Sequence, residues 1–214
     1  MIVVSSNDTK LNTNEKVHLG IEACLQLIPN IGGALATSFY GYQKEKKLKR
    51  LESFYNELSA DIEVIKASVQ SPSTTPDSEE LLSIIENLNE KVEREHIEEK
   101  RNYFKTYFIN NMLHHDQINY DNKKFFLDTL ANMTLIECNI ILDLFERPEP
   151  VSINAVSSGA MSKFQMIGAM HRLQSYGFIE MKERPSNTVR GELTKDVSIT
   201  HYGIRFVMFC LKQN

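Results

Sequence analysis

The chain has 214 residues, with 24 Lys+Arg against 28 Asp+Glu and 42% hydrophobic residues, which excludes bulk disorder. This length allows one large domain or two small ones. The formal net charge of −4 argues against a strongly basic nucleic-acid binder, but the charge is unevenly distributed. It is +3 over residues 1–50, −11 over 51–146 and +4 over 147–214, so an acidic middle lies between two mildly basic ends.

The N-terminal residues 1–16 are polar after the first four and are expected to form a flexible tail without a signal peptide. Three cysteines, Cys24, Cys138 and Cys210, are far apart, odd in number and set among apolar residues. This pattern predicts buried thiols rather than disulfides or a zinc site, and it favours the reducing cytoplasm.

An apolar window over residues 17–42 carries Glu22 as its one formal charge, and Pro29 and Gly32-Gly33 break it in the middle. The break predicts two short arms around a tight corner, which either pack in the protein's own core or contact a membrane. A basic run, 44–50, follows and would suit anionic lipid headgroups. The candidate membrane or partner residues are Leu25, Leu27, Ile28, Ile31, Phe39, Lys44, Lys46 and Lys47.

Two long helices are predicted next. Residues 33–70 carry apolar residues at three- and four-residue steps from Leu48 to Val69, as in a coiled-coil seam. A linker with two prolines, 71–77, precedes a second helix over 79–113. The short linker predicts an antiparallel helical hairpin, and we expect residues 17–115 to form one helical domain.

The second helix is predicted to have a charged first part and an aromatic second part. Its glutamates alternate with basic residues as on an exposed, ion-paired surface, and aromatic core residues follow. The exposed set is Glu93, Arg94, Glu95, Glu98, Glu99, Lys100 and Arg101, and the core set is Tyr103, Phe104, Tyr107, Phe108 and Met112.

The C-terminal part, 121–214, is predicted to be a second domain with a leading helix over 123–133. That helix is built on Phe125, Phe126, Leu130 and Met133. Thr134 and Glu137 form a capping-box signature for a helix over 135–146, followed by a short helix near 153–157. A longer helix over 162–175 is predicted to bury Phe164, Ile167, Met170 and Leu173, and to end at a left-handed Gly177. Strands over 178–181 and 197–199 flank a polar excursion, and Thr200 caps a last helix over 202–212.

This order of elements resembles the winged helix-turn-helix fold of bacterial regulators. The segments Arg172–Glu180 and Ile199–Gly203 are similar to the "rLe..GlI" and "lT..G" phrases of those regulators. The resemblance implies a recognition helix over 162–175 and a wing over 182–196. Candidate nucleic-acid contacts are Lys163, Gln165, His171, Arg172, Lys182, Arg184, Arg190 and Lys195. Such a module serves either a dimeric DNA-binding regulator or protein contacts alone.

The whole chain also resembles the Abi-alpha type of bacterial abortive-infection proteins. The resemblance rests on a Glu/Lys/Arg-led helix from Glu98 to Asn111, a polar break, and the apolar pattern from Lys124 to Leu142. It implies a bacterial or mobile-element protein of phage–host conflict, acting through protein or membrane contacts.

Sequence motifs for catalysis are missing. The chain contains no GxxxxGK[ST], GxGxxG, HExxH or GxSxG, so we expect a non-enzymatic protein without a cofactor or metal. Glu93 and His96 have the Glu-x-x-His spacing of di-iron bundles, but such a site also needs further inward-facing carboxylates, so a solvated helix surface is the preferred interpretation. His114-His115-Asp116 is interpreted as a loop. The expected fold is mainly α, with an N-terminal long helical hairpin and a C-terminal winged-helix domain that carries a small β-hairpin wing.

Overall fold

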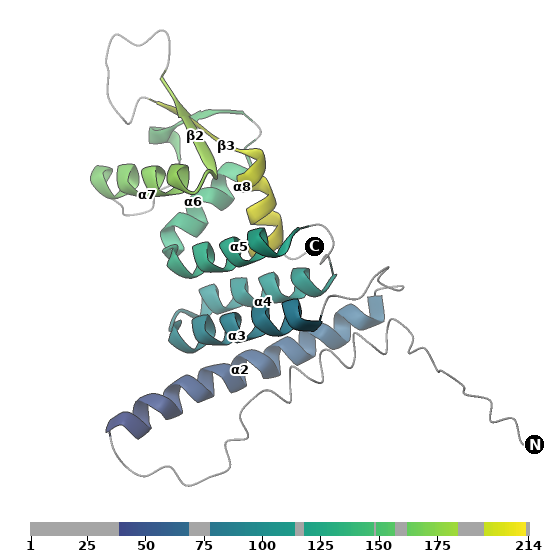
Figure 1. The fold of residues 1–214 in the computed structure, drawn as a ribbon. Helices are drawn as coiled ribbons and strands as arrows, with labels where there is room; N and C mark the ends of the chain where they lie inside the picture. The colour runs from purple at the N-terminus through teal and green to yellow at the C-terminus, as the bar shows by residue number, and fades with distance from the viewer. Residues whose placement is uncertain are drawn as a thin grey trace, which may run out of the picture. The chain divides into compact units, whose positions relative to one another are not determined.

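The computed structural model describes residues 39–68, 78–113, 118–147, 149–156, 162–183 and 195–212. In these residues the protein is mainly helical and carries one small three-stranded antiparallel sheet (Figure 1). The chain divides into two compact units, one containing the first two described helices and the other beginning at Glu95.

The first unit contains α2 (Phe39–Ser68) and α3 (Ser78–Arg94). The two helices are antiparallel, because Lys47 and Arg50 of α2 reach Glu93 of α3, whereas Tyr55 further along α2 donates to Asn89. Leu51, Phe54, Tyr55 and Leu58 of α2 are buried, as are Leu81, Ile84, Ile85, Leu88 and Val92 of α3. Leu51, Tyr55 and Leu58 of the predicted seam are buried and Leu48 is half-buried, whereas the side chains of the seam beyond Asp61 and the linker 71–77 lie outside the described residues.

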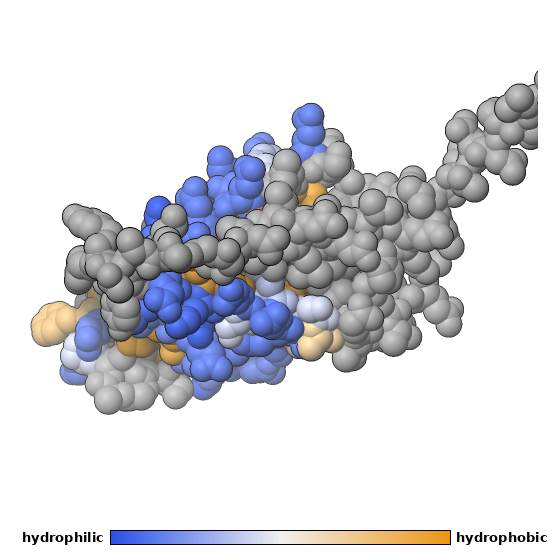
Figure 2. Space-filling model, turned by 90° about the horizontal axis from the view of Figure 1, so that it is seen from below, coloured by the Kyte–Doolittle hydropathy of each residue, from blue (hydrophilic) through white to orange (hydrophobic). Residues whose placement is uncertain are grey.

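Charged side chains cover much of the solvent face of these helices. Figure 2 shows a face on which the described residues are mostly hydrophilic, with small apolar areas between them. This is the surface expected of helices whose apolar residues are confined to one stripe.

The predicted single helix over 79–113 is wrong, because α3 ends at Arg94 and α4 (Glu98–Leu113) begins after a break. The Glu95 carboxylate accepts a hydrogen bond from the Ile97 backbone N–H at 2.9 Å and pairs with Lys100 at 2.8 Å. Lys100 also donates to the Ala131 carbonyl at 3.1 Å and is only 4% exposed. Glu95 and Lys100 therefore belong to an internal ion pair and not to the expected solvent surface.

The second unit is built around α4, α5 (Tyr120–Asn132) and α6 (Leu135–Phe145). Phe104, Tyr107, Phe108 and Met112 of α4 are buried as predicted, whereas Tyr103 of the predicted set is only half-buried. Asn110 of α4 donates to the carbonyls of Met208 and Phe209 at 3.1 Å, and so fixes α4 to the end of the chain. The Thr134–Glu137 capping box is also confirmed, with Thr134 at the N-cap of α6.

The sheet contains β1 (Val151–Ser152), β2 (Ile179–Lys182) and β3 (Asp196–Ile199) in the order β1-β3-β2. Ile179 pairs with Ile199 across β2 and β3, and Val151 pairs with Val197 across β1 and β3. The strand β1 was not predicted, since two residues between prolines and a short helix give no periodic signal. The predicted helix near 153–157 is a single 3-10 turn, η1 (Ile153–Ala155).

After β1 and η1 the chain forms α7 (Lys163–Ser175), and after β3 it forms α8 (His201–Phe206) and the π-helical segment η3 (Val207–Leu211). Thr200 caps α8 by accepting from Gly203 N–H at 3.0 Å, as predicted. Gly203 is required here, since a Cβ would lie 2.2 Å from the carbonyl oxygen of Phe178. The rings of Phe178 and Phe206 stack at 4.3 Å in the core below.

Candidate interaction surface on α7

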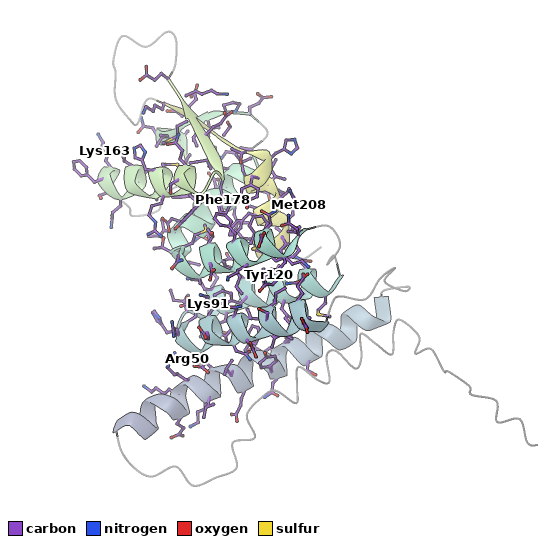
Figure 3. The ribbon with its side chains drawn as sticks, viewed as in Figure 1. Arg50, Lys91, Tyr120, Lys163, Phe178 and Met208 are labelled. Carbon is purple, nitrogen blue, oxygen red and sulfur yellow. The ribbon has the colours of Figure 1, made fainter. Side chains whose placement is uncertain are left out.

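The helix α7 is defined at both ends by its own sequence. Ser162 accepts from the Gln165 N–H, and the Gln165 side chain accepts from the Ser162 N–H at 2.9 Å, which forms a capping box. The helix ends at Tyr176, where Gly177 takes a positive φ of 76° as predicted. Figure 3 labels Lys163 at the free end of α7 and Phe178 in the interior of the same unit.

The buried side of α7 differs from the predicted one. Met166, Ala169, Met170 and Leu173 face the core, whereas Phe164 is 86% exposed and Ile167 is half-buried. The predicted set advanced by three residues at each step, and each such step rotates about 60° around a helix of 3.6 residues per turn. Those four positions therefore spread over half the circumference and could not share one face. The observed set follows the i, i+3, i+4, i+7 spacing of a true helical stripe.

The outward side of α7 is consequently an apolar and polar mixture without acidic residues. Phe164, Gly168, His171 and Ser175 recur at i, i+4, i+7 and i+11 along its centre, and all four are exposed. Lys163, Gln165 and Gln174 lie at the edges of this face and are exposed as well.

Arg172, nominated as a nucleic-acid contact, is occupied by contacts within the unit. Its Nε lies 3.0 Å from the Glu137 carboxylate, and its Nη2 donates to the Asn132 carbonyl at 2.8 Å and to the Tyr176 hydroxyl at 3.2 Å. The Tyr176 hydrogen bond raises the pKa of Arg172, the Glu137 charge adds to this, and partial burial opposes both. Arg172 therefore fastens α7 to α6 at the end of the helix opposite to Phe164.

The other nominated residues are only partly brought together. Lys163, Gln165 and His171 are exposed on α7, although the Gln165 side chain is engaged in the capping box. Lys182 on β2 pairs with Glu180 at 2.8 Å. Lys195 is half-buried at the start of β3, and its carbonyl accepts from the Ile153 N–H. Arg184 and Arg190 lie outside the described residues.

Most of the N-terminal candidates also fall outside what is described. Leu25, Leu27, Ile28 and Ile31 precede the first described residue, and Phe39 and Lys44 belong to α2 without described side chains. Lys46 is exposed, and Lys47 is 44% exposed and lies 3.9 Å from Glu93.

Groups that could support chemistry are buried or dispersed in the described part of the chain. Burial raises the pKa of the Cys138 thiol to about 12 and that of Cys210 well above its ordinary range, which disfavours the reactive thiolate form at both. No three His, Cys, Asp or Glu side chains gather as metal ligands among the residues described, and His114-His115-Asp116 lies outside them.

The lengths and hydropathies of the described helices bear on whether they could span a membrane. None of them is by itself long and apolar enough to cross a bilayer. The helices α5 and α6 pass on length and composition only as a pair, and the pair is bent by 119°.

Sequence reasoning missed Phe164 as an outward residue and Glu137 as the partner of Arg172. The outward orientation of Phe164 could have been predicted by comparing two sets of apolar positions on α7. Positions 166, 169, 170 and 173 fit a single helical face better than positions 164, 167, 170 and 173. The second left no local signal, since α6 and α7 are separated by the strand β1 and the turn η1.

Comparison with known proteins finds no matching family model, no matching curated protein and no matching solved structure.

Proposed function

We propose that this chain is a non-enzymatic helical protein that binds another protein chain through the outward face of α7. The single observation that carries the proposal is the 86% exposure of Phe164, which lies on the midline of that face near the start of the helix. In the same unit, the aromatic side chains of Phe126, Phe178 and Phe206 are fully buried. Burying an exposed phenylalanine side chain against a partner contributes about 1.5–3 kcal/mol to the free energy of association. Aromatic residues are enriched at the centres of protein interfaces.

We also propose that α7 belongs to a winged-helix type of module. It is supported by the element order α6–β1–η1–α7–β2–β3 and by the antiparallel sheet order β1-β3-β2. In such a module α7 is the helix that meets the partner, and residues 182–196 are the wing. The antiparallel pairing of α2 with α3 supports a helical hairpin as the second module.

Duplex DNA is the weaker alternative for the same face. A strong duplex binder neutralises roughly 6–10 phosphates. Of the nominated cations, Arg172 is paired with the buried Glu137 and Lys182 with Glu180. Exposed Glu180 on β2 and exposed Glu183 directly after it also oppose a polyanion. The described part of the module therefore offers too few available positive charges for strong binding.

Site-specific photo-cross-linking of the full chain in cells tests this proposal. A photoreactive phenylalanine analogue replaces Phe164, and the control carries it at Asn139, an exposed position on α6. We expect a discrete protein adduct from position 164 that the control does not give. Adducts to nucleic acid, or no adduct beyond that of the control, would overturn protein docking at α7.

The biological setting is part of the proposal and rests on the resemblance to abortive-infection proteins. It assigns the chain to a bacterial or mobile-element system of phage conflict in the cytoplasm. Inspection of the neighbouring genes tests this setting, since genes of an ordinary metabolic regulon on both sides would contradict it.

A second contact, with an anionic membrane surface, is proposed for residues 17–50. The observation that favours it is the exposure of Lys46 and Lys49 in the N-terminal half of α2, where Lys49, 69% exposed, also pairs with Glu45 at 2.7 Å. Anionic vesicles should sediment the full chain, and the Lys44/Lys46/Lys47→Glu variant should remain in the supernatant. Equal behaviour of both proteins, or sedimentation independent of lipid, would contradict it.

A further inference from the structure

The outward surface of α7 contains a protrusion and a recess one helical turn apart. The protrusion is Phe164 and the recess is Gly168, which follows it at i+4 on the same exposed face. Half-buried Ile167 and exposed His171 border the recess. Positions i, i+3, i+4 and i+7 form the four-residue hole into which a side chain of a packed neighbouring helix inserts.

No contact among the described residues explains the glycine at the recess. A Cβ built on Gly168 meets no atom within 4 Å, and its φ is not positive. Glycine inside a helix lowers the stability of the helix relative to alanine. A glycine with this cost and no internal constraint suits a site that another chain approaches closely.

We propose that the partner of this face is a second copy of the same chain, docked α7 against α7 about a two-fold axis. This inference rests on the proposed function, because it names the occupant of the same surface. In an isologous interface, residue i contacts residue j while j contacts i. A two-fold axis at the level of Met166 places Phe164 of each copy over Gly168 of the other. One helix then supplies both the protrusion and the recess.

The charges on α7 permit this arrangement. The helix has no acidic residue, and the centre of its outward face carries no Lys or Arg. About such an axis, the two Lys163 residues lie roughly 9 Å apart along the helix direction, at 1.5 Å per residue. That separation is close to the Debye length of about 8 Å at physiological ionic strength. Arg172 of each copy is already paired with its own Glu137.

The size of the surface sets the strength of the dimer. A helix of 13 residues is roughly 20 Å long and 10 Å wide, and one face of it buries less than the ~800 Å² per partner of a standard interface. The dimer is therefore weak and depends on protein concentration, with Phe164 as its main anchor.

Disulfide trapping in the full chain tests the geometry directly. In a Cys24→Ser background, the Phe164→Cys protein is mixed with the Gly168→Cys protein under mild oxidation. The mixed pair retains one native Phe164–Gly168 contact. The two remaining cysteines are buried and have raised pKa values, so they do not compete. We expect the 164–168 cross-link to form severalfold faster than any link in either protein alone or with an Asn139→Cys control.

Sedimentation velocity over a concentration series gives the second readout. The apparent mass of the wild-type protein should rise above the monomer mass of 24.6 kDa as the protein concentration increases. Phe164→Ser should weaken this association at least tenfold, and Met208→Ser, an exposed apolar position outside α7, should leave it unchanged.

The outcomes separate this inference from the proposed function. Equal association of wild type and Phe164→Ser, or equal cross-linking of all pairs, overturns the α7 dimer. If the partner photo-cross-linked at position 164 is then a different protein, the proposal that α7 binds a protein stands, but the proposal that the partner is a second copy of this chain is wrong. If only nucleic acid is captured there, both proposals fail.

Discussion

At the residue scale, Glu137 joins three parts of the second unit through one carboxylate. Its Oε2 accepts from the Thr134 N–H at 2.7 Å and from the Thr134 hydroxyl at 2.9 Å, while its Oε1 pairs with Arg172 at 3.0 Å. The side chain is only 2% exposed. It therefore caps α6 and orients α7, and through α7 it supports the position of Phe164.

Glu137→Ala should destabilise the protein by about 2 kcal/mol, since it removes a helix cap and leaves Arg172 without its charge partner. This expected loss of stability is smaller than for a fully buried ion pair, because the Arg172 side chain is 46% exposed. Urea unfolding followed by circular dichroism measures it. Glu90→Ala, at an exposed position of α3, should change stability by less than about 0.5 kcal/mol. A loss no larger than that of this control would contradict the role of Glu137.

Glu95 gives a pH-dependent contribution to stability. Burial acts to raise its pKa, but the Lys100 hydrogen bond and charge and the Ile97 N–H outweigh burial, so the pKa of Glu95 lies below its ordinary 4.5. A carboxyl with a lowered folded-state pKa stabilises the fold above its unfolded pKa, and this stabilisation is lost as the pH falls through the folded value.

The difference in unfolding free energy between the wild-type protein and Glu95→Gln should therefore shrink as the pH falls from about 7 to about 3. Urea unfolding of both proteins at several pH values measures the difference. A stability gap between them that is constant over this range, or that widens in acid, would show that the ion pair does not supply the stabilisation.

At the scale of the elements, three glycines in the second unit have different roles. Gly177 has a positive φ, Gly203 lies against the Phe178 carbonyl, and a Cβ on Gly168 would meet no atom of the described residues within 4 Å. Gly168→Ala should therefore stabilise the isolated chain by about 0.5–1 kcal/mol. Gly203→Ala should instead destabilise it by about 1–3 kcal/mol or more, because a Cβ does not fit. Urea unfolding at low protein concentration compares the two, and destabilisation by Gly168→Ala would show an internal constraint on this position.

The elements that the sequence predicts well are those whose signals are local. Thr134 and Thr200 are caps with their own partners three residues away, and Gly177 ends α7 in the left-handed conformation. The elements it predicts poorly depend on distant residues. The strand β1 exists because Val151 pairs with Val197, and the break before α4 is held in place by Lys100, which reaches the carbonyl of Ala131.

The break before α4 also shows how charge patterns can be misread. Lys91 and Arg94 lie in the last turn of α3, while Glu98 and Glu99 lie in the first turn of α4. These are the charges that favour a helix end and a helix start. In the sequence they resemble the alternating ion pairs of one continuous exposed helix, and no Gly or Pro marks the boundary.

The candidate site could be predicted only in part. The boundaries of α7 and the exposure of Lys163, Gln165 and His171 agree with the sequence analysis. The apolar character of the outward face was missed because Phe164 and Ile167 were assigned to the core. The pairing of Arg172 with Glu137 depends on how α6 and α7 cross, which no local pattern encodes.

At the scale of the whole molecule, the uneven charge limits what the chain can bind. The segment 51–146 has a net charge of −11 and the segment 147–214 only +4. In the described residues of the latter, Lys182 and Arg172 are paired with carboxylates, as is Lys212, which pairs with Glu146. Attraction to a polyanion is therefore local and opposed by the rest of the chain.

Binding to a duplex of mixed sequence should accordingly be weak even at about 50 mM salt, where electrostatic affinity is strong. Each phosphate neutralised contributes about −0.9 to the slope of log K against log salt, so we expect a slope smaller in magnitude than about 3. Fluorescence anisotropy over a salt series measures it, with Lys163→Gln as the comparison variant. A slope of about −6 or steeper that becomes shallower in Lys163→Gln would assign the outward face of α7 to DNA and remove the argument for protein docking there.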